Sequence, residues 1–224
     1  MALYIVSTPI GNLEDITIRA INTLKAVDFI AAEDTRHSII LLNKYEIRKP
    51  LLSFHSHSGG AKIDKIIENL KQEKSCALIT DAGTPGISDP AYSLIKAAIA
   101  ENIRIIPVPG PAAFLAALVG TGLPMNEFIY MGFLPIKKGR QTLLNRLKDE
   151  EKTVIFYESP HRLQKTLVQL EEYLGPDRKI VVARELTKIH EEFIRGTVSE
   201  AREHFEKHPV KGEITIVLSG STLK

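Results

Sequence analysis

Three loops rich in glycine and proline follow short apolar runs in the first half of the chain. They span residues 8–13, 81–90 and 107–113, and the second loop carries the carboxylates of Asp81 and Asp89. Glycine lets a backbone approach a ligand closely and adopt positive φ, whereas proline fixes the shape of a loop. Backbone amides and carbonyls without a lysine suit a ligand that has a polar, zwitterionic end and a flat heterocycle.

Two common nucleotide-binding signatures are missing from these loops. The chain has no G-x-x-x-x-G-K-[ST] sequence, which argues against a P-loop, and no G-x-G-x-x-G after its first apolar run, so the usual dinucleotide fingerprint is absent. His55 and His57 form a close pair but have no nearby cysteine or acidic cluster. We therefore expect them to be polar loop residues, and we predict no metal site.

Ten short β-rich runs precede or separate these loops, and they alternate with helical patterns along the whole chain. Most are continuous apolar runs, which is typical of strands that are covered on both faces. The alternation predicts an α/β protein whose loops lie at the carboxyl ends of strands, where open sheets bind ligands. The predicted strands are Leu3–Ser7, Phe29–Ala32, Leu51–Phe54, Cys76–Thr80, Ile103–Val108, Phe128–Met131, Thr153–Tyr157, Ile180–Arg184, Glu192–Gly196 and Ile214–Leu218.

Two of the intervening segments have a clear helical period. Apolar residues between 63 and 70, and leucines between 163 and 174, recur at the i, i+3, i+4, i+7 spacing of one helix face. The second helix has strong end signals, because Ser159-Pro160 stands at its start and Gly175-Pro176 just beyond its end.

A Gly/Pro cluster close to the midpoint of the chain, Gly120–Pro124, predicts a boundary between two lobes. We therefore expect one domain over residues 1–121 and a second over residues 122–224. Two lobes of similar size would meet at a cleft, which is a common place for a ligand site.

The composition is that of an ordinary globular protein. A hydrophobic fraction of 44% and a charged fraction of 25% exclude a disordered chain, and a net charge of +2 excludes a uniformly basic nucleic-acid binder. Cys76, the only cysteine, lies in an apolar stretch, so we expect a buried thiol and no internal disulfide. The chain has neither a basic signal-peptide start nor an apolar run of the roughly 20 residues that span a bilayer, which predicts a soluble cytoplasmic protein.

Eight motifs in a fixed order decide between the candidate ligands. Together they closely resemble the ribosomal RNA small-subunit methyltransferase I family, within the tetrapyrrole methylase superfamily, and the match spans nearly the whole chain. The motifs are Thr8–Leu13, Ala32–Arg36, Asp81–Pro90, Pro109–Ala113, Gly132–Pro135, Tyr157–Arg162, Arg184–Lys188 and Lys211–Glu213.

The resemblance implies a homodimer of two-lobed chains, each lobe a mixed sheet flanked by helices, with S-adenosylmethionine in the cleft between the lobes. The implied reaction is methylation of the ribose 2′-hydroxyl of a cytidine in the decoding region of 16S ribosomal RNA, probed here within the small ribosomal subunit. The implied cofactor-binding residues are Pro9, Gly11, Asp81, Gly83, Thr84, Gly86, Gly110, Ala112, Ala113, Gly212 and Glu213.

The carboxylate of Asp81 suits a positively charged ligand. It can accept a hydrogen bond from the methionine amino group or offset the sulfonium charge. The alternative is a cap for the following helix, but Asp89, directly before Pro90, is the better cap candidate.

Methyl transfer to a ribose hydroxyl needs in-line geometry, and a base or a cationic neighbour assists it because the hydroxyl is a weak acid. Each polar group that follows a predicted strand can serve in this way or can belong to an ion pair that braces the fold. The candidate catalytic residues are Glu33, Glu158, His161 and Glu185, and Asp34, Arg36, Arg162 and Lys188 lie beside them in the sequence.

The stretch Gly132–Lys148 has five basic residues and no acidic one. Positive charge after a second-lobe strand suits contacts to RNA phosphates, which give salt-dependent affinity. The alternative is an exposed helix face whose alkyl stems cover leucines. The residues that we predict to bind RNA are Arg36, Lys137, Lys138, Arg140 and Arg162.

Two departures from the family pattern are visible. Ala91 stands where the family usually has glycine, and many members continue past the Gly-Glu strand into a helical segment, whose RNA contacts we expect to be absent here. Two other functions remain open at this point: methylation of a small tetrapyrrole, and a non-catalytic role in RNA binding or ribosome assembly.

Overall fold

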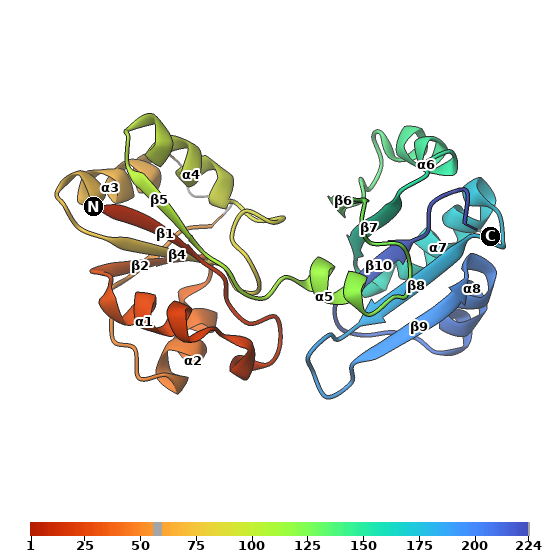
Figure 1. Ribbon diagram of the computed structural model, residues 1–224, viewed down its shortest axis with the longest axis horizontal. Helices are drawn as coiled ribbons and strands as arrows, with labels where there is room; N and C mark the ends of the chain where they lie inside the picture. Colours follow the sequence, from red (N-terminus) through yellow and green to blue (C-terminus); the bar gives the residue numbers. More distant parts are fainter. Residues whose placement is uncertain (56–59, 224) are drawn as a thin grey trace. The chain divides into compact units, whose positions relative to one another are not determined.

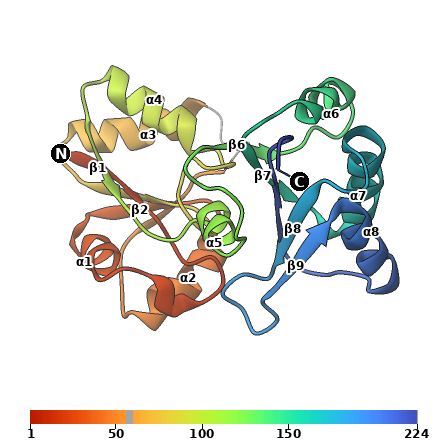
Figure 2. The same cartoon turned by 45° about the vertical axis from the view of Figure 1, so that its right-hand side comes forward.

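The computed structural model describes residues 1–55 and 60–223, and the chain divides into two compact units, Met1–Ala112 and Ala113–Lys224. Each unit contains one five-stranded sheet with helices packed on it (Figures 1 and 2). Within the described part of the chain, no helix is both long and apolar enough to cross a membrane.

The sheet of the first unit is parallel throughout, with the strand order β3-β2-β4-β1-β5. The expectation of a mixed sheet in this lobe is therefore wrong. Each parallel connection needs a crossover, and the helices that follow the strands supply it. The strands are β1 (Ala2–Val6), β2 (Phe29–Ala32), β3 (Leu51–Ser53), β4 (Cys76–Ile79) and β5 (Arg104–Val108).

Helices cover both faces of this sheet, as the continuous apolar strands predict. One core cluster joins strand residues to Leu24 and Leu41 on one face, and another joins them to Ile66 and Leu94 on the other (Figure 1). Cys76 is fully buried between them, and burial raises the pKa of its thiol to about 12. The helices are η1 (Leu13–Asp15), α1 (Ile18–Ala26), α2 (Thr35–Lys44), α3 (Gly60–Lys71) and α4 (Ala91–Ala100).

The sheet of the second unit is mixed, with the order β6-β7-β10-β8-β9. Its β6–β7 pair is parallel and the other three pairs are antiparallel. The strands are β6 (Phe128–Phe133), β7 (Thr153–Glu158), β8 (Lys179–Arg184), β9 (Glu192–Thr197) and β10 (Ile214–Leu218). All ten predicted strands are thus present, with ends that differ by a residue or two.

The main core of this unit lies between one face of the sheet and three helices, α6 (Arg140–Lys148), α7 (Pro160–Leu174) and α8 (Val198–Lys207). The end signals of α7 are confirmed: the Ser159 side chain accepts a hydrogen bond from the His161 amide, and Gly175 ends the helix at φ 87°.

A further helix, α5 (Ala113–Val119), packs against β7 and β10 on the opposite face of the second sheet (Figure 1). The units therefore divide before α5, not after Thr121. Glycine and proline mark where the chain turns, but the packing of α5 on the second sheet decides to which unit it belongs.

Candidate cofactor and catalytic site

The three Gly/Pro loops lie together at one edge of the first sheet, because β4, β1 and β5 are adjacent and parallel. Thr8 and Gly83 form a bridge in which the Thr8 amide donates to the Gly83 carbonyl at 2.9 Å and the Gly83 amide to the Thr8 carbonyl at 3.1 Å. Thr84 Oγ1 donates to the Pro111 carbonyl at 3.0 Å and lies 2.9 Å from Ser7 Oγ, which must then be the donor between them. The hydroxyls of Ser7 and Thr84 thus connect all three loops.

Glycine is required where the loops pass one another. A Cβ on Gly110 would lie 2.9 Å from the Cβ of Ser7, closer than packed carbon atoms approach. Gly83 and Gly86 have φ values of +83° and +94°, in the region that side chains disfavour. The loops are therefore fixed in shape by their own backbone, and they need no ligand to hold them together.

Two carboxylates lie at the ends of the neighbouring strands β2 and β4. Asp81 Oδ1 accepts a hydrogen bond from the Asp34 amide at 3.0 Å, and Glu33 Oε2 accepts one from Thr80 Oγ1 at 2.6 Å. Hydrogen bonds therefore connect Glu33 and Asp81, which are far apart in the sequence, to the same pair of strand ends.

The other charged groups of this edge serve the backbone. Asp34 caps α2 by accepting from the Arg36 amide at 2.9 Å, and its carboxylate pairs with the Arg36 guanidinium at 3.1 Å. Asp89 accepts from the amides of Gly86 and Ala91, so it holds the loop and the start of α4, as its position before proline predicts. Asp81 makes no such cap, which leaves it available to a ligand.

The donor set at this edge fits S-adenosylmethionine. The cofactor carries an ammonium and a sulfonium, and the edge offers carboxylates, carbonyls and hydroxyls rather than cations. Pro9 is buried beneath the loop and Gly11 is exposed on it. Ala112 and Ala113 are half-buried where the third loop enters α5.

In the second unit, Glu185 is the centre of an ion-pair network. Its Oε1 accepts from Lys188 Nζ at 2.8 Å and from the Glu213 amide at 3.0 Å, and Lys188 also pairs with the Glu213 carboxylate at 2.8 Å. Gly212 has φ +91°, and a side chain there would collide with the Glu185 carboxylate. That Gly212 and Glu213 contact the cofactor stays a prediction.

This network changes the ionisation of both partners. The hydrogen bond from Lys188 lowers the pKa of Glu185 below its ordinary value. Burial opposes the charge of Lys188, but its hydrogen bonds to Glu185 and Glu213 outweigh that effect and raise its pKa. A carboxylate with a lowered pKa is a weaker base, which argues against Glu185 as the group that accepts the substrate proton.

Glu158 is buried, and its carboxylate accepts three kinds of donor. Oε1 accepts from the Ser159 amide and from Arg162 Nε, both at 2.7 Å, and Oε2 accepts from Thr166 Oγ1 at 2.6 Å. Its side chain is 0% exposed. This burial and saturation make Glu158 a structural group and do not support its prediction as a base.

Arg140 extends the same network and is a correction to the predicted RNA contacts. It is 7% exposed, and its guanidinium donates to Thr166 Oγ1, to Gln169 Oε1 and to the Pro135 carbonyl at 2.8, 2.7 and 3.0 Å. A guanidinium buried in this way cannot present its charge to a phosphate. Arg162 is partly exposed and is held by Glu158 and by the Leu134 carbonyl.

The remaining predicted groups are accessible. His161 is exposed in the first turn of α7, and Lys137 and Lys138 are exposed in the loop before α6. His55 lies 3.4 Å from Lys62 Nζ, whereas His57 lies outside the described residues. In residues 1–55 and 60–223 there is no group of three or more His, Cys, Asp or Glu side chains placed to hold a metal ion.

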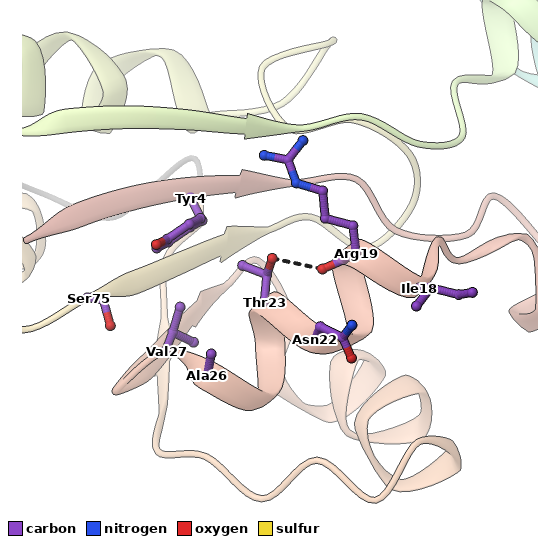
Figure 3. A pocket seen from close by; sticks show the side chains of 8 residues that line it. All are labelled: Tyr4, Ile18, Arg19, Asn22, Thr23, Ala26, Val27 and Ser75. Carbon is purple, nitrogen blue, oxygen red and sulfur yellow. Dashed lines mark hydrogen bonds between the residues drawn. The ribbon is translucent and has the colours of Figure 1, made fainter.

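A separate surface pocket lies beside α1, far along the strands from the loops. Figure 3 shows its lining, in which Thr23 Oγ1 donates to the Arg19 carbonyl at 2.8 Å. Ser75 precedes β4, so this pocket belongs to the amino ends of the strands and not to the loop edge. The lining residues are Tyr4, Ile18, Arg19, Asn22, Thr23, Ala26, Val27 and Ser75.

Comparison with known proteins assigns the family. Residues 2–202 match the model of the Tetrapyrrole (Corrin/Porphyrin) Methylases. The chain is 53% identical to "Ribosomal RNA small subunit methyltransferase I" of Thermotoga maritima, over 97% of this chain and 98% of that protein. The chain belongs to the ribosomal RNA small subunit methyltransferase I family. A Bacillus subtilis protein of the same name is 49% identical, over 98% of this chain and 75% of its own length.

Solved structures show the same fold outside this family. A diphthine synthase structure has a TM-score of 0.77 at 12% identity and covers 98% of this chain and 90% of its own. A cobalt precorrin-4 methyltransferase has a TM-score of 0.74 at 18% identity, with 97% and 94% covered. The two-lobed tetrapyrrole methylase fold expected from the sequence is thereby confirmed.

Sequence reasoning missed two features of this family member. The hydroxyls of Ser7 and Thr80 hold the loop edge together, but a serine or threonine at a strand end gives no signal of its partner. A row of aromatic side chains on β6 and β7 also went unnoticed, because Tyr130 and Tyr157 are separated in the sequence and look like ordinary strand residues.

Proposed function

We propose that this protein transfers a methyl group from S-adenosylmethionine to the ribose 2′-hydroxyl of a cytidine in the decoding region of 16S ribosomal RNA. The observation that carries the proposal is identity of about one half, over nearly the whole chain, to proteins named ribosomal RNA small subunit methyltransferase I. A solved structure with this fold, 16% identical, is described as complexed with S-adenosyl homocysteine, the product that such a transfer would leave.

The loop edge of the first unit is the proposed cofactor site. When bound, S-adenosylmethionine supplies an electrophilic methyl group on a sulfonium. The Asp34 amide holds one oxygen of Asp81, so the carboxylate keeps a fixed orientation in which its other oxygen can accept from the ligand ammonium. Gly83, Gly86 and Gly110 allow the backbone close to the ligand. Preorganised loops of this kind pay little ordering cost on binding.

Positioning supplies much of the acceleration in this proposal, because methyl transfer from a sulfonium is intrinsically favourable. The proton of the 2′-hydroxyl must leave as the oxygen–carbon bond forms. Among the four predicted bases, Glu158 is saturated with donors and Glu185 has a lowered pKa. We therefore favour Glu33 or His161, whose side chains lie at a strand end and in an exposed first turn.

RNA binding is assigned to Lys137 and Lys138, with Arg36 and Arg162 as further candidates. Both lysines are exposed, and no acidic residue interrupts the stretch Gly132–Lys148. We also propose a homodimer, on the resemblance alone, and sedimentation velocity of the purified chain measures it. The tetrapyrrole alternative is weaker, because the relatives of that kind are only 18% identical or less among the structures compared.

The decisive experiment incubates labelled S-adenosylmethionine with small ribosomal subunits that lack the modification and maps the labelled nucleotide. We expect label on a ribose 2′-oxygen of one cytidine near the decoding centre. Label on a base, or transfer to a porphyrinoid but not to subunits, would refute the proposal. An absence of both transfer and cofactor binding would instead favour the scaffold role in RNA binding or assembly.

The cofactor assignment is tested separately by Asp81→Ala. Loss of a hydrogen bond to a charged group costs about 1.5–3 kcal/mol, which weakens the Kd by about 10- to 150-fold. Calorimetric titration with S-adenosylmethionine measures the change, and Asp64→Ala, an exposed acid on α3, is the matched control. Equal affinity of the Asp81 variant and the wild type would remove Asp81 from the site.

A further inference from the structure

Five aromatic side chains form a continuous row on the second unit. Their ring centroids follow one another at 6.3, 4.7, 5.4 and 5.5 Å, within the range of favourable aromatic contact. In order of contact the aromatic row is Phe128, Phe114, Tyr130, Tyr157 and Phe133. None of these side chains has a role in the site described above.

The row lies on the face of the sheet that α6, α7 and α8 leave uncovered. Phe156 points into the core against those helices, so its neighbour Tyr157 points to the other face. Ile129 and Met131 likewise pack on the core, which turns Tyr130 the same way as Tyr157. The row therefore stands on β6, which is an edge strand, and on β7 beside it.

A bulge in β6 adds Phe133 to this face. The pairing runs from Tyr130 opposite Ile155 to Phe133 opposite Tyr157, with a register shift between them, and Gly132 adopts φ +63° within the shift. Strict alternation would put residue 132, not residue 133, beside Tyr130. Bulges commonly re-aim a side chain next to a functional site. Here the bulge places an aromatic ring where regular β-structure would not.

The ends of the row are open to solvent. Phe133 is 55% exposed and Phe128 is 36% exposed. Tyr157 lies half-buried behind Phe133, and burial raises the pKa of its phenol, so the ring stays neutral at physiological pH. An exposed ring supported by a second ring is a rigid apolar surface with one free face.

Positive charge follows directly on the exposed end. Lys137 and Lys138 are exposed and lie only a few residues beyond Phe133, in a stretch without acidic residues. Exposed aromatic faces combined with lysine are the usual way in which proteins hold single-stranded nucleic acid, because bases stack on the rings and phosphates pair with the cations. A peptide partner of acidic character would pair with the lysines but would gain little from an open π-face.

We propose that Phe133, supported by Tyr157, is a stacking platform for an unpaired base of the RNA substrate, and that Lys137 and Lys138 bind the phosphate beside that base. This inference rests on the proposed function, since it names how the RNA is held. It assigns substrate positioning to residues that do not touch the cofactor loops.

The chain has no tryptophan, so Phe133→Trp introduces a single fluorescent reporter at the platform. We expect its emission to be quenched on titration with a single-stranded oligocytidylate, because a base stacks on the indole. Phe133→Ala should weaken binding of the same oligonucleotide by about 5- to 150-fold, the range for loss of one base–aromatic stack. Its salt dependence should equal that of the wild type, since no phosphate contact is removed.

Two control variants separate stacking from other effects. Phe133→Leu keeps an apolar side chain without a π-face and should bind nearly as weakly as Phe133→Ala. Tyr92→Ala removes another aromatic side chain, 69% exposed on α4, and should leave binding unchanged.

Wild-type affinity in Phe133→Ala or in Phe133→Leu would overturn the platform. A change in sedimentation coefficient on mutation of Phe133, with RNA affinity unchanged, would assign the aromatic row to a protein interface and would also overturn it. Methyl transfer to small subunits is measured in parallel. Wild-type transfer with an unaltered KM in Phe133→Ala defeats this inference alone, whereas no transfer by the wild type defeats the proposed function.

Discussion

The buried carboxylate of Glu158 permits a sharp distinction between a structural and a catalytic role. Glu158→Ala would remove the acceptor of Arg162 Nε, of Thr166 Oγ1 and of the Ser159 amide in one step. Removing one partner of a buried ion pair costs about 3–5 kcal/mol, because the other charge stays buried without compensation. For a chain of this size that corresponds to a fall in Tm of about 6–20 °C.

Urea unfolding followed by far-ultraviolet circular dichroism measures this loss, since the chain has no tryptophan to report it. The matched control is Glu127→Ala, which breaks the exposed pair between Glu127 and Lys152 at 3.0 Å and should cost less than about 1 kcal/mol. Glu158→Gln keeps the volume and some hydrogen bonds, so its loss should be intermediate.

The opposite pattern would refute the structural role of Glu158. If Glu158→Gln unfolds at the wild-type urea concentration but transfers methyl groups at less than one hundredth of the wild-type rate, the carboxylate acts in the reaction. A wild-type unfolding midpoint in Glu158→Ala would likewise show that the buried network contributes no stability.

Three further predictions concern the basic loop and the Glu185 network. The double substitution Lys137→Ala, Lys138→Ala should lower the slope of log K against log[salt] for RNA by about 1.4, at about 0.7 for each lost phosphate contact on a single strand; equal slopes would exclude both lysines. Gly212→Ala should lower the free energy of unfolding by about 1–3 kcal/mol, because φ is +91° and the new Cβ meets a carboxylate; an unchanged thermal midpoint would contradict this. The lowered pKa of Glu185 contributes stability that is complete above the unfolded value near 4 and is lost as pH falls through the folded value. The raised pKa of Lys188 contributes stability that is complete below the unfolded value near 10 and is lost as pH rises through the folded value, so Lys188→Met should flatten both limbs of the stability–pH curve measured by urea unfolding.

The strands were predictable because a buried strand needs a run of apolar residues, and local sequence reports burial directly. The four residues of β2 and the five of β10 are all buried, and both strands have the predicted bounds. The direction of the strands was not predictable in the same way. An apolar run reads alike whether its neighbours are parallel or antiparallel, so the sequence did not distinguish the parallel first sheet from the mixed second one.

The candidate site divides along the same line. Asp89 was recognisable as a cap because its partners, Gly86 and Ala91, lie within three residues of it. Arg140 was misinterpreted because its partners, Thr166 and Gln169, lie on another helix. Lys137 and Arg140 look equivalent in the sequence, yet one is exposed and the other is buried.

By itself, the sequence determined the family, the ten strands and the three loops, since each of these depends on motifs or on apolar runs that are local in the chain. Only the tertiary structure decided which groups meet: Thr8 with Gly83, Thr80 with Glu33, and Phe133 with Tyr157 across a bulge. These contacts join distant parts of the chain, and they depend on strand order, register and backbone twist. Those quantities are set by the packing of whole elements, which no short segment of sequence encodes.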